Sequence, residues 1–211
     1  MPGRHAAREL VRRLRPLIGD RRVLDAIAAT PREMFVPAPL RDHAYDNEAL
    51  PIAGGQTISQ PLVVARMLEL LELSGDELVL DVGTGSGYHA ALLAALAREV
   101  ISIEVVTELH DAAVVRLRRL GLRNVTCLVA DGWRGWPERA PYDAINVAAA
   151  SARQPPARLL EQLAAGGRMV LPVGRRRQRL TVVRRDHDGR FSRETLEPVR
   201  FVPLVHRGPA P

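Results

Sequence analysis

The stretch Leu78–Ala90 reads LVLDVGTGSGYHA and predicts a strand, a tight turn and the start of a helix. An apolar run reaches Val82 and is followed by three glycines, Gly83, Gly85 and Gly87, and then by an alanine- and leucine-rich helical pattern. Glycine permits positive φ and close approach of a ligand, and a helix N-terminus offers unpaired N–H groups. Asp81 lies near the end of the strand, where open α/β sheets bind their ligands.

The glycine spacing indicates a ligand without phosphate groups. A dinucleotide loop typically has the wider G-x-G-x-x-G pattern, which places a pyrophosphate on the helix N-terminus. The tighter loop, with an acid before it, suits a cationic and phosphate-free ligand such as S-adenosylmethionine. The next apolar run, Val100 to Ile103, ends in Glu104, whose carboxylate can accept both ribose hydroxyls. From these residues alone, the alternative is a βαβ turn that binds nothing.

Length and composition limit the classes to which the protein can belong. The 211 residues, 46% of them hydrophobic, suit one domain with a full core. No apolar run approaches the roughly 18 residues of a membrane span, and the N-terminus lacks the apolar region of a signal peptide, so a cytoplasmic protein is expected. Cys127 is the only cysteine, which excludes an internal disulfide and a cysteine-based zinc site. No metal site is predicted.

The basic charge raises the question of nucleic-acid binding. The net charge is +6 and the isoelectric point is near 10.7. However, the arginines are spread along the chain, and the densest run, Arg175 to Arg177, lies between two strand-like segments, as in a solvated hairpin turn. No aromatic stacking platform accompanies that run. We expect a monomer with no specific nucleic-acid partner and no membrane partner.

The first third of the chain combines helices with a long loop. Helical spacing predicts a helix over 5–18 and a second one capped by Asp20. The segment from Pro31 to Pro61 loses periodicity, and its length is typical of functional loops. Pro61 then begins a helix, so Thr57 or Ser59 could be its N-cap. Capping would explain one hydroxyl but not the whole loop.

The remainder alternates between strand and helix patterns. Strands are predicted at 78–82, 100–103, 125–129, 143–147, 168–173, 179–184 and 199–204, and helices at 88–97, 107–120 and 156–164. This order predicts an α/β fold, a doubly wound and mostly parallel sheet, with N-terminal helices and an antiparallel C-terminal edge. Asp81, Glu104 and Asp131 end consecutive strands and should meet at one edge of the sheet. That convergence favours the nucleoside site over the empty turn.

Seven stretches, in order, resemble the protein-L-isoaspartate O-methyltransferase family. They are PREMFVP (31–37), AYDNEALPI (44–52), GQTISQP (55–61), DVGTGSGY (81–88), DGWRGWPERAPYDAI (131–145), LLEQLAAGGRMVLPVG (159–174) and VRFVPLV (199–205). The resemblance runs from about residue 5 to 206, and GQTISQP separates this family from others with a similar glycine loop. It implies a single Rossmann-like methyltransferase domain over 1–211, with helices and a substrate and cofactor loop in 1–75 and the α/β core in 76–211.

The resemblance also implies the activity and its residues. The family methylates isoaspartyl residues of damaged proteins and peptides, with S-adenosyl-L-methionine as methyl donor and S-adenosyl-L-homocysteine as product. Ser59 matches the active-site serine. Cofactor contacts fall on Thr57, Ile58, Asp81, Gly83, Thr84, Gly85, Gly87, Tyr88, Glu104, Asp131 and Gly132. Substrate contacts fall on Ile52, Ala53, Gly54, Gly55, Ala149, Ala150 and Val205. The chain departs from the family pattern at Ala53-Gly54, Val105, Ala130 and Gln154, which affects peptide preference and removes no group that the chemistry needs.

Physical reasoning adds a mechanism and leaves alternatives open. A carboxylate is ionised at pH 7, so its methylation needs alignment rather than a base, and we expect Ser59 to donate a hydrogen bond to the isoaspartyl α-carboxylate. His43 and His89 flank the key loops without partners at metal-ligand spacing, and surface or lining roles are predicted. Trp133 could stack on adenine or pack a loop, and Trp136 is expected to pack. The other readings are an enzyme that makes isoaspartate in a precursor peptide, a nucleic-acid methyltransferase, and a binding protein without turnover.

Overall fold

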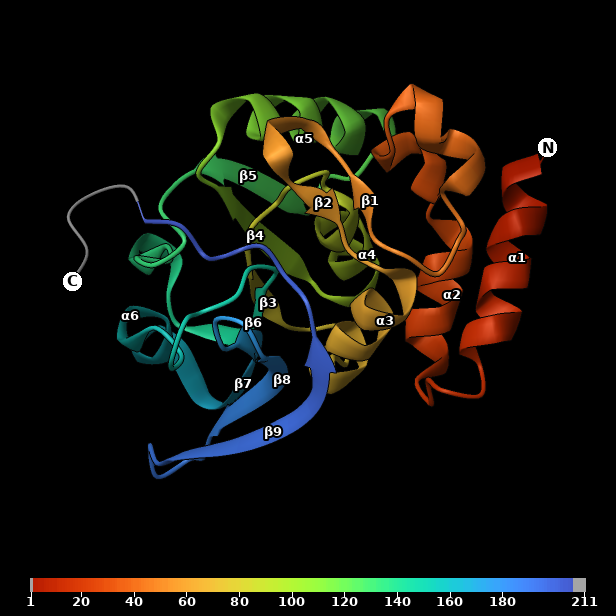
Figure 1. Cartoon of the computed structure of the whole chain (residues 1–211). Helices are drawn as coiled ribbons and strands as arrows, with labels where there is room; N and C mark the ends of the chain where they lie inside the picture. Colours follow the sequence, from red (N-terminus) through yellow and green to blue (C-terminus); the bar gives the residue numbers. More distant parts are fainter. Residues whose placement is uncertain (1, 207–211) are drawn as a thin grey trace.

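A computed structural model describes residues 2–206 and places one seven-stranded sheet within them. Its strand order is β5-β4-β3-β6-β7-β8-β9; β5 to β7 pair in parallel, and β8 at the edge pairs antiparallel with both β7 and β9 (Figure 1). The strands are β3 (Leu78–Val82), β4 (Glu99–Glu104), β5 (Val125–Val129), β6 (Tyr142–Val147), β7 (Leu163–Val173), β8 (Gln178–Arg185) and β9 (Phe191–Val199). The predicted doubly wound sheet with an antiparallel edge is confirmed.

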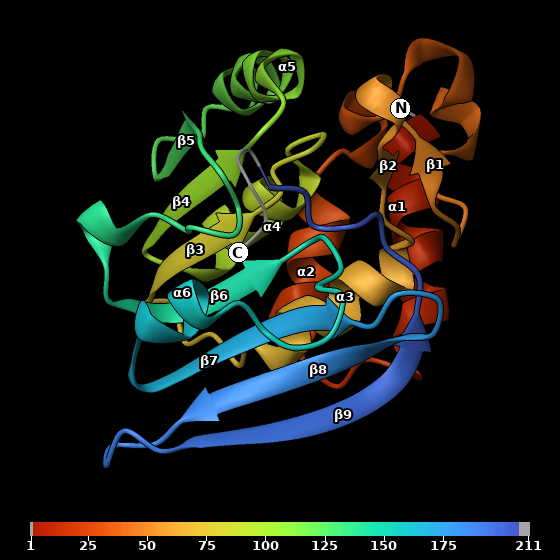
Figure 2. The ribbon, with the colours of Figure 1, turned by 60° about the vertical axis from the view of Figure 1, so that its left-hand side comes forward.

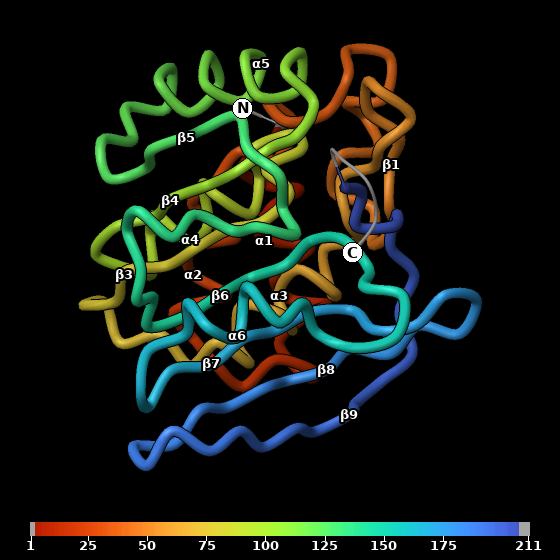
Figure 3. Tube along the Cα trace, turned by 90° about the vertical axis from the view of Figure 1, so that its left-hand side faces the viewer, coloured from red at the N-terminus to blue at the C-terminus, as the bar shows by residue number. Residues whose placement is uncertain are grey.

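Helices cover both faces of this sheet, as Figures 2 and 3 show. They are α1 (Pro2–Leu14), α2 (Arg21–Ala29), α3 (Pro61–Leu70), α4 (Tyr88–Leu96), α5 (Thr107–Arg119) and α6 (Ala157–Glu161). Side chains alternate along the strands: Val79 packs in the cluster formed with α1 to α4, whereas Leu80 packs in the cluster on the α6 side. Because both faces are buried, the central strands read as continuous apolar runs in the sequence.

The last predicted strand, 199–204, is wrong. The final strand is β9, which ends at Val199, and residues 200–206 leave the sheet as a segment that we call the C-terminal strap. The strap crosses the carboxyl ends of the central strands (Figure 1), where the Ala150 N–H donates to the Val202 carbonyl and the Leu204 N–H donates to the Ala150 carbonyl. An exposed edge strand needs only backbone pairing with its neighbour. The polar sequence of β9 therefore lacks the apolar pattern from which a strand is predicted. The strap has an apolar run because Val202 to Val205 line a cavity at the carboxyl edge of the sheet.

The predicted loop of 31–61 contains short 3₁₀ turns and one small hairpin, β1 (Leu50–Pro51) paired with β2 (Thr57–Ile58). The N-cap of α3 is Gln60, whose side chain does not cap the helix, and Asn47 Oδ1 accepts from the Leu62 N–H of its first turn at 3.0 Å. The capping alternative for Thr57 and Ser59 is therefore wrong, and both hydroxyls are left for another role. A second boundary also differs: the helix predicted over 156–164 ends at Glu161, and β7 begins at Leu163.

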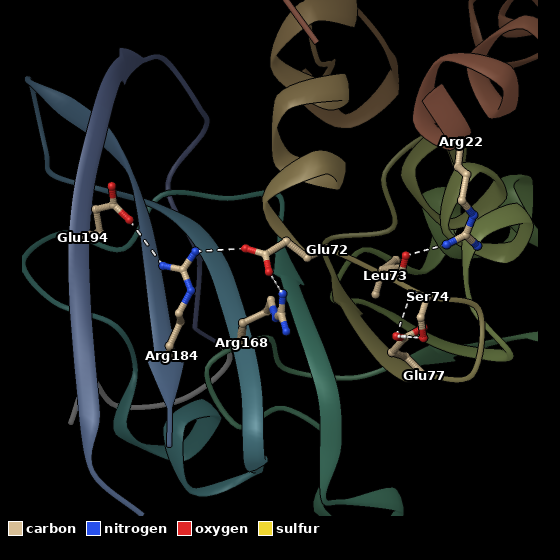
Figure 4. Close-up of polar contacts among 8 residues, drawn as sticks. All are labelled: Arg22, Glu72, Leu73, Ser74, Glu77, Arg168, Arg184 and Glu194. Carbon is tan, nitrogen blue, oxygen red and sulfur yellow. Dashed lines mark hydrogen bonds and ion pairs between the residues drawn. The ribbon is translucent and has the colours of Figure 1, made fainter. Parts of the chain in front are cut away.

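At the amino ends of the strands, the connection from α3 to β3 is fixed by ion pairs and hydrogen bonds (Figure 4). Glu72 bridges Arg168 of β7 and Arg184 of β8, and Arg184 also contacts Glu194. On the other side, Arg22 of α2 donates to the Leu73 carbonyl at 2.5 Å. These contacts join the N-terminal helices to the sheet at the end opposite to the glycine loop.

Candidate functional site

A cavity lies at the carboxyl edge of the sheet, between the glycine loop, the β1–β2 hairpin and the C-terminal strap. The empty space inside it, which includes solvent at the open mouth, is about 800 Å³. The predicted site residues that line it are Thr57, Ile58, Ser59, Gly83, Thr84, Gly85, Tyr88, Glu104, Gly132, Ala149 and Val205. The structure therefore brings the loop serine and the ribose-binding acid of the prediction to one cavity.

Other predicted residues lie outside the lining. They are Ile52, Ala53, Gly54, Gly55, Asp81, Gly87, Asp131 and Ala150. Gly87 has a packing role: it is the N-cap of α4 with φ of 91°, and a Cβ there would lie 3.3 Å from the Ala113 Cβ. Ala150 pairs with the strap through two backbone hydrogen bonds. Gly87 and Ala150 therefore support the walls of the cavity rather than facing it.

Glu104 is held rigidly by backbone donors. The Gly85 N–H donates to its Oε2 at 2.8 Å, and the N–H groups of Val105 and Val106 donate to its Oε1 at 2.9 and 3.0 Å. The side chain lines the cavity although the residue is only 6% exposed. A carboxylate has more acceptor sites than these three bonds use. Its remaining acceptor site, on Oε2, is open to a hydroxyl of a bound ligand.

Asp81 acts on the cavity through two hydroxyls. The fully buried carboxylate accepts from Ser102 Oγ at 2.7 Å and from Asn146 Nδ2 at 2.8 Å. Ser102 Oγ also lies 2.7 Å from Thr84 Oγ1. Because the single Ser102 proton goes to Asp81, Thr84 must donate to Ser102, and its own lone pairs are left to face the cavity. Burial, with a contribution from the Glu104 charge, raises the pKa of Asp81 to about 6.

Arg32 supports the backbone of the site, and the sequence did not reveal it. It is fully buried; its Nε donates to the Ala44 carbonyl and its Nη2 to the Ser59 carbonyl, both at 2.8 Å. The guanidinium carbon lies 4.7 Å from the centre of the Tyr88 ring. The residue lies in the PREMFVP stretch, where an arginine among apolar residues is the only sequence signal. It fixes the backbone of the serine that faces the cavity.

The buried Nε2 atom of the lining residue His89 has no hydrogen-bond partner among residues 2–206, whereas the Tyr88 hydroxyl lies beside the Arg32 guanidinium. Burial, followed by the Arg32 charge, lowers the pKa of His89 to about 4, so the imidazole is neutral at pH 7. A buried polar group nearly always has a partner, and a ligand or water in the cavity would provide one for His89. His89 is a lining residue, and the surface alternative for it is wrong.

The two residues predicted on the adenine side, Asp131 and Gly132, lie under the strap. Asp131 accepts from the Trp133 N–H at 2.9 Å and also contacts His206. The Trp133 indole donates to the Leu204 carbonyl at 3.1 Å, which favours the loop-packing role over stacking on a ligand. Gly132 has no room for a side chain, because a Cβ would lie 2.7 Å from Val82.

His43 has neighbours that its sequence spacing did not suggest. It forms an exposed group with Asp46 and Glu48, whose ligand atoms all lie within 4.8 Å of one another. The Nδ1 of His43 lies 2.8 Å from Asp46 Oδ2, so an ordinary surface ion pair accounts for this contact. Trp136 packs against the core cluster on the α6 side, in agreement with the prediction.

Comparison with known proteins places the chain in a family. The family model described as protein-L-isoaspartate(D-aspartate) O-methyltransferase matches residues 5–208. The chain belongs to this family. It is 57% identical over 196 residues to the protein-L-isoaspartate O-methyltransferase of Anaeromyxobacter dehalogenans, covering 92% of this chain and 93% of that protein. It is 53% identical over 189 residues to the enzyme of the same name from Shewanella amazonensis, covering 90% and 89%.

Solved structures support the fold of this methyltransferase family. A structure named protein-L-isoaspartate O-methyltransferase matches with a TM-score of 0.84 and 28% identity, covering 93% of this chain and 65% of that one. A Plasmodium falciparum structure described as a beta-aspartate methyltransferase in complex with S-adenosyl-L-homocysteine matches with a TM-score of 0.83, 24% identity and coverage of 94% and 98%. The resemblance read from the sequence motifs is confirmed, and with it an S-adenosyl-L-methionine-dependent methyltransferase of isoaspartyl proteins. Within residues 2–206, no helix has the length and apolar character needed to cross a bilayer.

Proposed function

We propose that this chain methylates the free α-carboxylate of L-isoaspartyl residues in damaged proteins and peptides. The carboxylate oxygen bonds to the methyl carbon as the carbon–sulfur bond breaks, which leaves a methyl ester. The following backbone nitrogen then displaces methanol to give a succinimide, and water opens it in part to normal aspartate. The observation that carries the proposal is the single cavity that joins Glu104 and the glycine loop to Ser59 in a chain of this family.

The chain's task in this reaction is alignment and exclusion of water. The methyl donor supplies an electrophilic carbon on a sulfonium, and the carboxylate needs no base because it is ionised at neutral pH. His89 is neutral at the cavity wall, because its pKa is lowered to about 4. Ser59 donates a hydrogen bond that orients the carboxylate, while Arg32 holds the Ser59 backbone from behind.

The cofactor roles proposed for individual residues follow the geometry. Glu104 accepts the ribose hydroxyls, and the backbone from Gly83 to Gly85 lies against the amino-acid end. Asp81 sets the direction of the Thr84 hydroxyl through Ser102. The remaining predicted residues that line the cavity are Thr57, Ile58, Tyr88 and Gly132, whereas Gly87 and Asp131 lie outside the lining and are proposed to support the cofactor site indirectly.

The substrate backbone is proposed to lie at the mouth of the cavity. The segments involved are Ile52 to Gly55 of the hairpin, Ala149 and Ala150 after β6, and Val205 of the strap. Of these, Ala149 and Val205 line the cavity directly. The hairpin turn uses positive φ at Gly54 and Gly55, 66° and 67°, so the Ala53-Gly54 departure is accommodated by glycine geometry.

Changing Glu104 to glutamine is expected to raise KM for S-adenosyl-L-methionine about tenfold. The amide would turn an N–H₂ toward one of the three backbone N–H donors and offer fewer acceptors to the ribose. Steady-state kinetics with varied cofactor measures the effect. The control is Glu108→Gln, an exposed glutamate four residues along the chain. An unchanged KM in Glu104→Gln would contradict the ribose role.

Changing Ser59 to alanine is expected to lower kcat/KM for an isoaspartyl peptide about tenfold. The melting temperature should stay near that of the parent, because Ser59 caps no helix. The assay is transfer of labelled methyl to paired peptides that differ only in Asp or isoAsp, with the exposed Ser192→Ala as control. Equal kcat/KM in Ser59→Ala and the parent protein would rule out the orienting role.

The same peptide pair separates the competing functions. Methylation of the isoAsp peptide alone supports repair, whereas methylation of the Asp peptide alone supports an enzyme that makes isoaspartate. Cofactor binding without transfer to either peptide supports a binding protein without turnover.

We further propose a single-domain cytoplasmic monomer without nucleic-acid or membrane partners. The single-domain proposal is supported by the Arg22 and Glu72 contacts that join the N-terminal helices to the sheet. Arg175 to Arg177 lie in the turn between β7 and β8, which supports a solvated hairpin rather than a nucleic-acid site. Cys127 is a free thiol, as is usual in a reducing compartment. Sedimentation equilibrium tests the monomer.

A further inference from the structure

A groove leads away from the site on the surface between α3 and the end of β9, which lie side by side in Figures 1 and 2. Its inner part shares Thr57 and Ser59 with the cavity. Its outer part shares Val63 and Val199 with the inner part and ends at Leu17, which is 60% exposed. We call this the α3–β9 groove, and it is defined by Ser59, Gln60, Val63, Pro198, Val199 and Arg200.

The wall of the groove nearest to Ser59 is held in place before any ligand arrives. The Gln60 amide donates to the Asn47 carbonyl at 2.8 Å, and the Leu62 N–H donates to Asn47 Oδ1 at 3.0 Å. These bonds fix the start of α3 against the preceding loop. A groove fixed in this way binds an extended chain with little further loss of conformational entropy.

The charges along the groove are unequal. At the outer part, Arg66 is neutralised by Glu69 and Glu197, which lie 2.6 and 3.1 Å from its guanidinium. At the inner part, Arg200 is exposed and has no ion-pair partner among residues 2–206. Apart from Arg200, the inner part is lined by uncharged residues, with the polar Thr57, Ser59 and Gln60 beside the apolar Val63, Pro198 and Val199. It therefore presents one uncompensated positive charge close to Ser59.

We propose that the α3–β9 groove binds the polypeptide on one side of the isoaspartyl residue and that Arg200 selects an acidic side chain there. The inference rests on the proposed function, because it takes the carboxylate that is methylated to lie at Ser59. The flanking chain must leave the cavity over its rim, and Ser59 and Thr57 belong to both the cavity and the groove. An extended chain advances about 3.3 Å per residue, so three residues on either side of the isoaspartate span about 10 Å of groove in each direction, and these are the positions to test.

The test compares isoaspartyl peptides of one length that carry Glu, Gln or Lys at each of the three positions on either side. Variants are Arg200→Glu and, as a control for charge, Arg193→Glu, which reverses another exposed arginine of the β9 region outside the groove. At low salt, the parent protein should show a kcat/KM for the best Glu peptide about two- to fivefold above that for the matching Lys peptide. Arg200→Glu should reverse that ratio, and Arg193→Glu should retain it.

Each outcome has one meaning. A Glu-to-Lys ratio that is the same in Arg200→Glu and the parent protein overturns the groove inference while leaving the proposed function in place. A change of oligomeric state in Arg200→Glu without a change of that ratio overturns it in favour of a second copy of the chain in the groove. Absence of methylation of every isoaspartyl peptide by the parent protein overturns the proposed function and this inference with it. Loss of the preference at high ionic strength would support the role of charge.

Discussion

Replacing Asp81 by asparagine is expected to weaken S-adenosyl-L-methionine binding about ten- to hundredfold at pH 8, the range for loss of hydrogen bonds to a charged group. Asparagine has the shape of aspartate, so the packing beneath the glycine loop is kept. Its amide would, however, donate to Ser102, which would then donate to Thr84 and leave a proton where the cavity now has lone pairs. The negative charge beneath a cationic ligand would also be lost. Titration calorimetry measures the affinity.

The same variant tests the ionisation of Asp81. Because its pKa is raised to about 6, the carboxyl is protonated below that pH and ionised above it. Cofactor affinity of the parent protein should therefore fall as the pH drops through about 6, and Asp81→Asn should show no such step. The exposed Asp111→Asn serves as control and should keep the parent's pH profile.

The contribution of Asp81 to the free energy of unfolding should change with pH in the direction opposite to that of cofactor affinity. A carboxyl whose pKa is raised on folding stabilises the fold below its unfolded value of 3.8, and this contribution is lost as the pH rises through about 6. That shift of roughly 2 pKa units corresponds to about 3 kcal/mol. The free energy of unfolding of Asp81→Asn, relative to the parent protein, should thus rise by about 2 kcal/mol from pH 4 to pH 8, because part of the full contribution is already lost at pH 4. A difference that does not vary with pH would contradict the raised pKa.

The sequence was sufficient to predict the parts of the molecule that are fixed by local chemistry. The glycine loop, the strand before it and Glu104 follow from residue types and spacing, since a tight turn needs glycine and a parallel sheet buried on both faces needs apolar runs. The convergence of Glu104 and Gly132 on one cavity follows from parallel topology. These features depend on neighbours in sequence or in the regular sheet.

The parts that the sequence did not predict depend on tertiary contacts. β9 is an edge strand whose polar residues carry no alternation, and the apolar strap at 200–206 resembled a strand because it covers the cavity. Likewise, Arg32 looks like a surface residue in a charged chain. Its burial depends on the carbonyls of Ala44 and Ser59, which lie 12 and 27 residues away. The α3–β9 groove joins segments that are far apart in the chain.

Replacing Arg32 by methionine is expected to lower kcat about a hundredfold with little change in KM for the cofactor. The variant loses the two hydrogen bonds that hold the Ala44 and Ser59 carbonyls, and a displacement of about 1 Å at a reacting group can cost this much in rate. The glycine loop and Glu104 belong to the sheet, so the cofactor site should persist. Lysine at the same position keeps the charge but lacks the planar fork, and we expect an intermediate kcat.

In Arg32→Met, the free energy of unfolding should change by less than the activation free energy of the reaction. Two buried carbonyls lose their donors, at a cost of about 1–3 kcal/mol each. Against this, the variant removes a buried charge that has no carboxylate bonded to it among residues 2–206, and burial lowers the pKa of that guanidinium. Methionine also fills the apolar space beside the Tyr88 ring.

A matched control separates positioning of Ser59 from general loosening of the loop. Arg13 donates to the Tyr45 carbonyl at 2.8 Å, one residue from Ala44, but makes no bond to Ser59. Arg13→Met should therefore lower kcat much less than Arg32→Met. Equal losses in the two variants, or a rise in cofactor KM that parallels the fall in kcat, would show that Arg32 only supports the fold. A loss confined to kcat in Arg32→Met, with partial recovery in Arg32→Lys, is the result that positioning requires, because the reacting carboxylate, unlike the cofactor, meets the protein at Ser59.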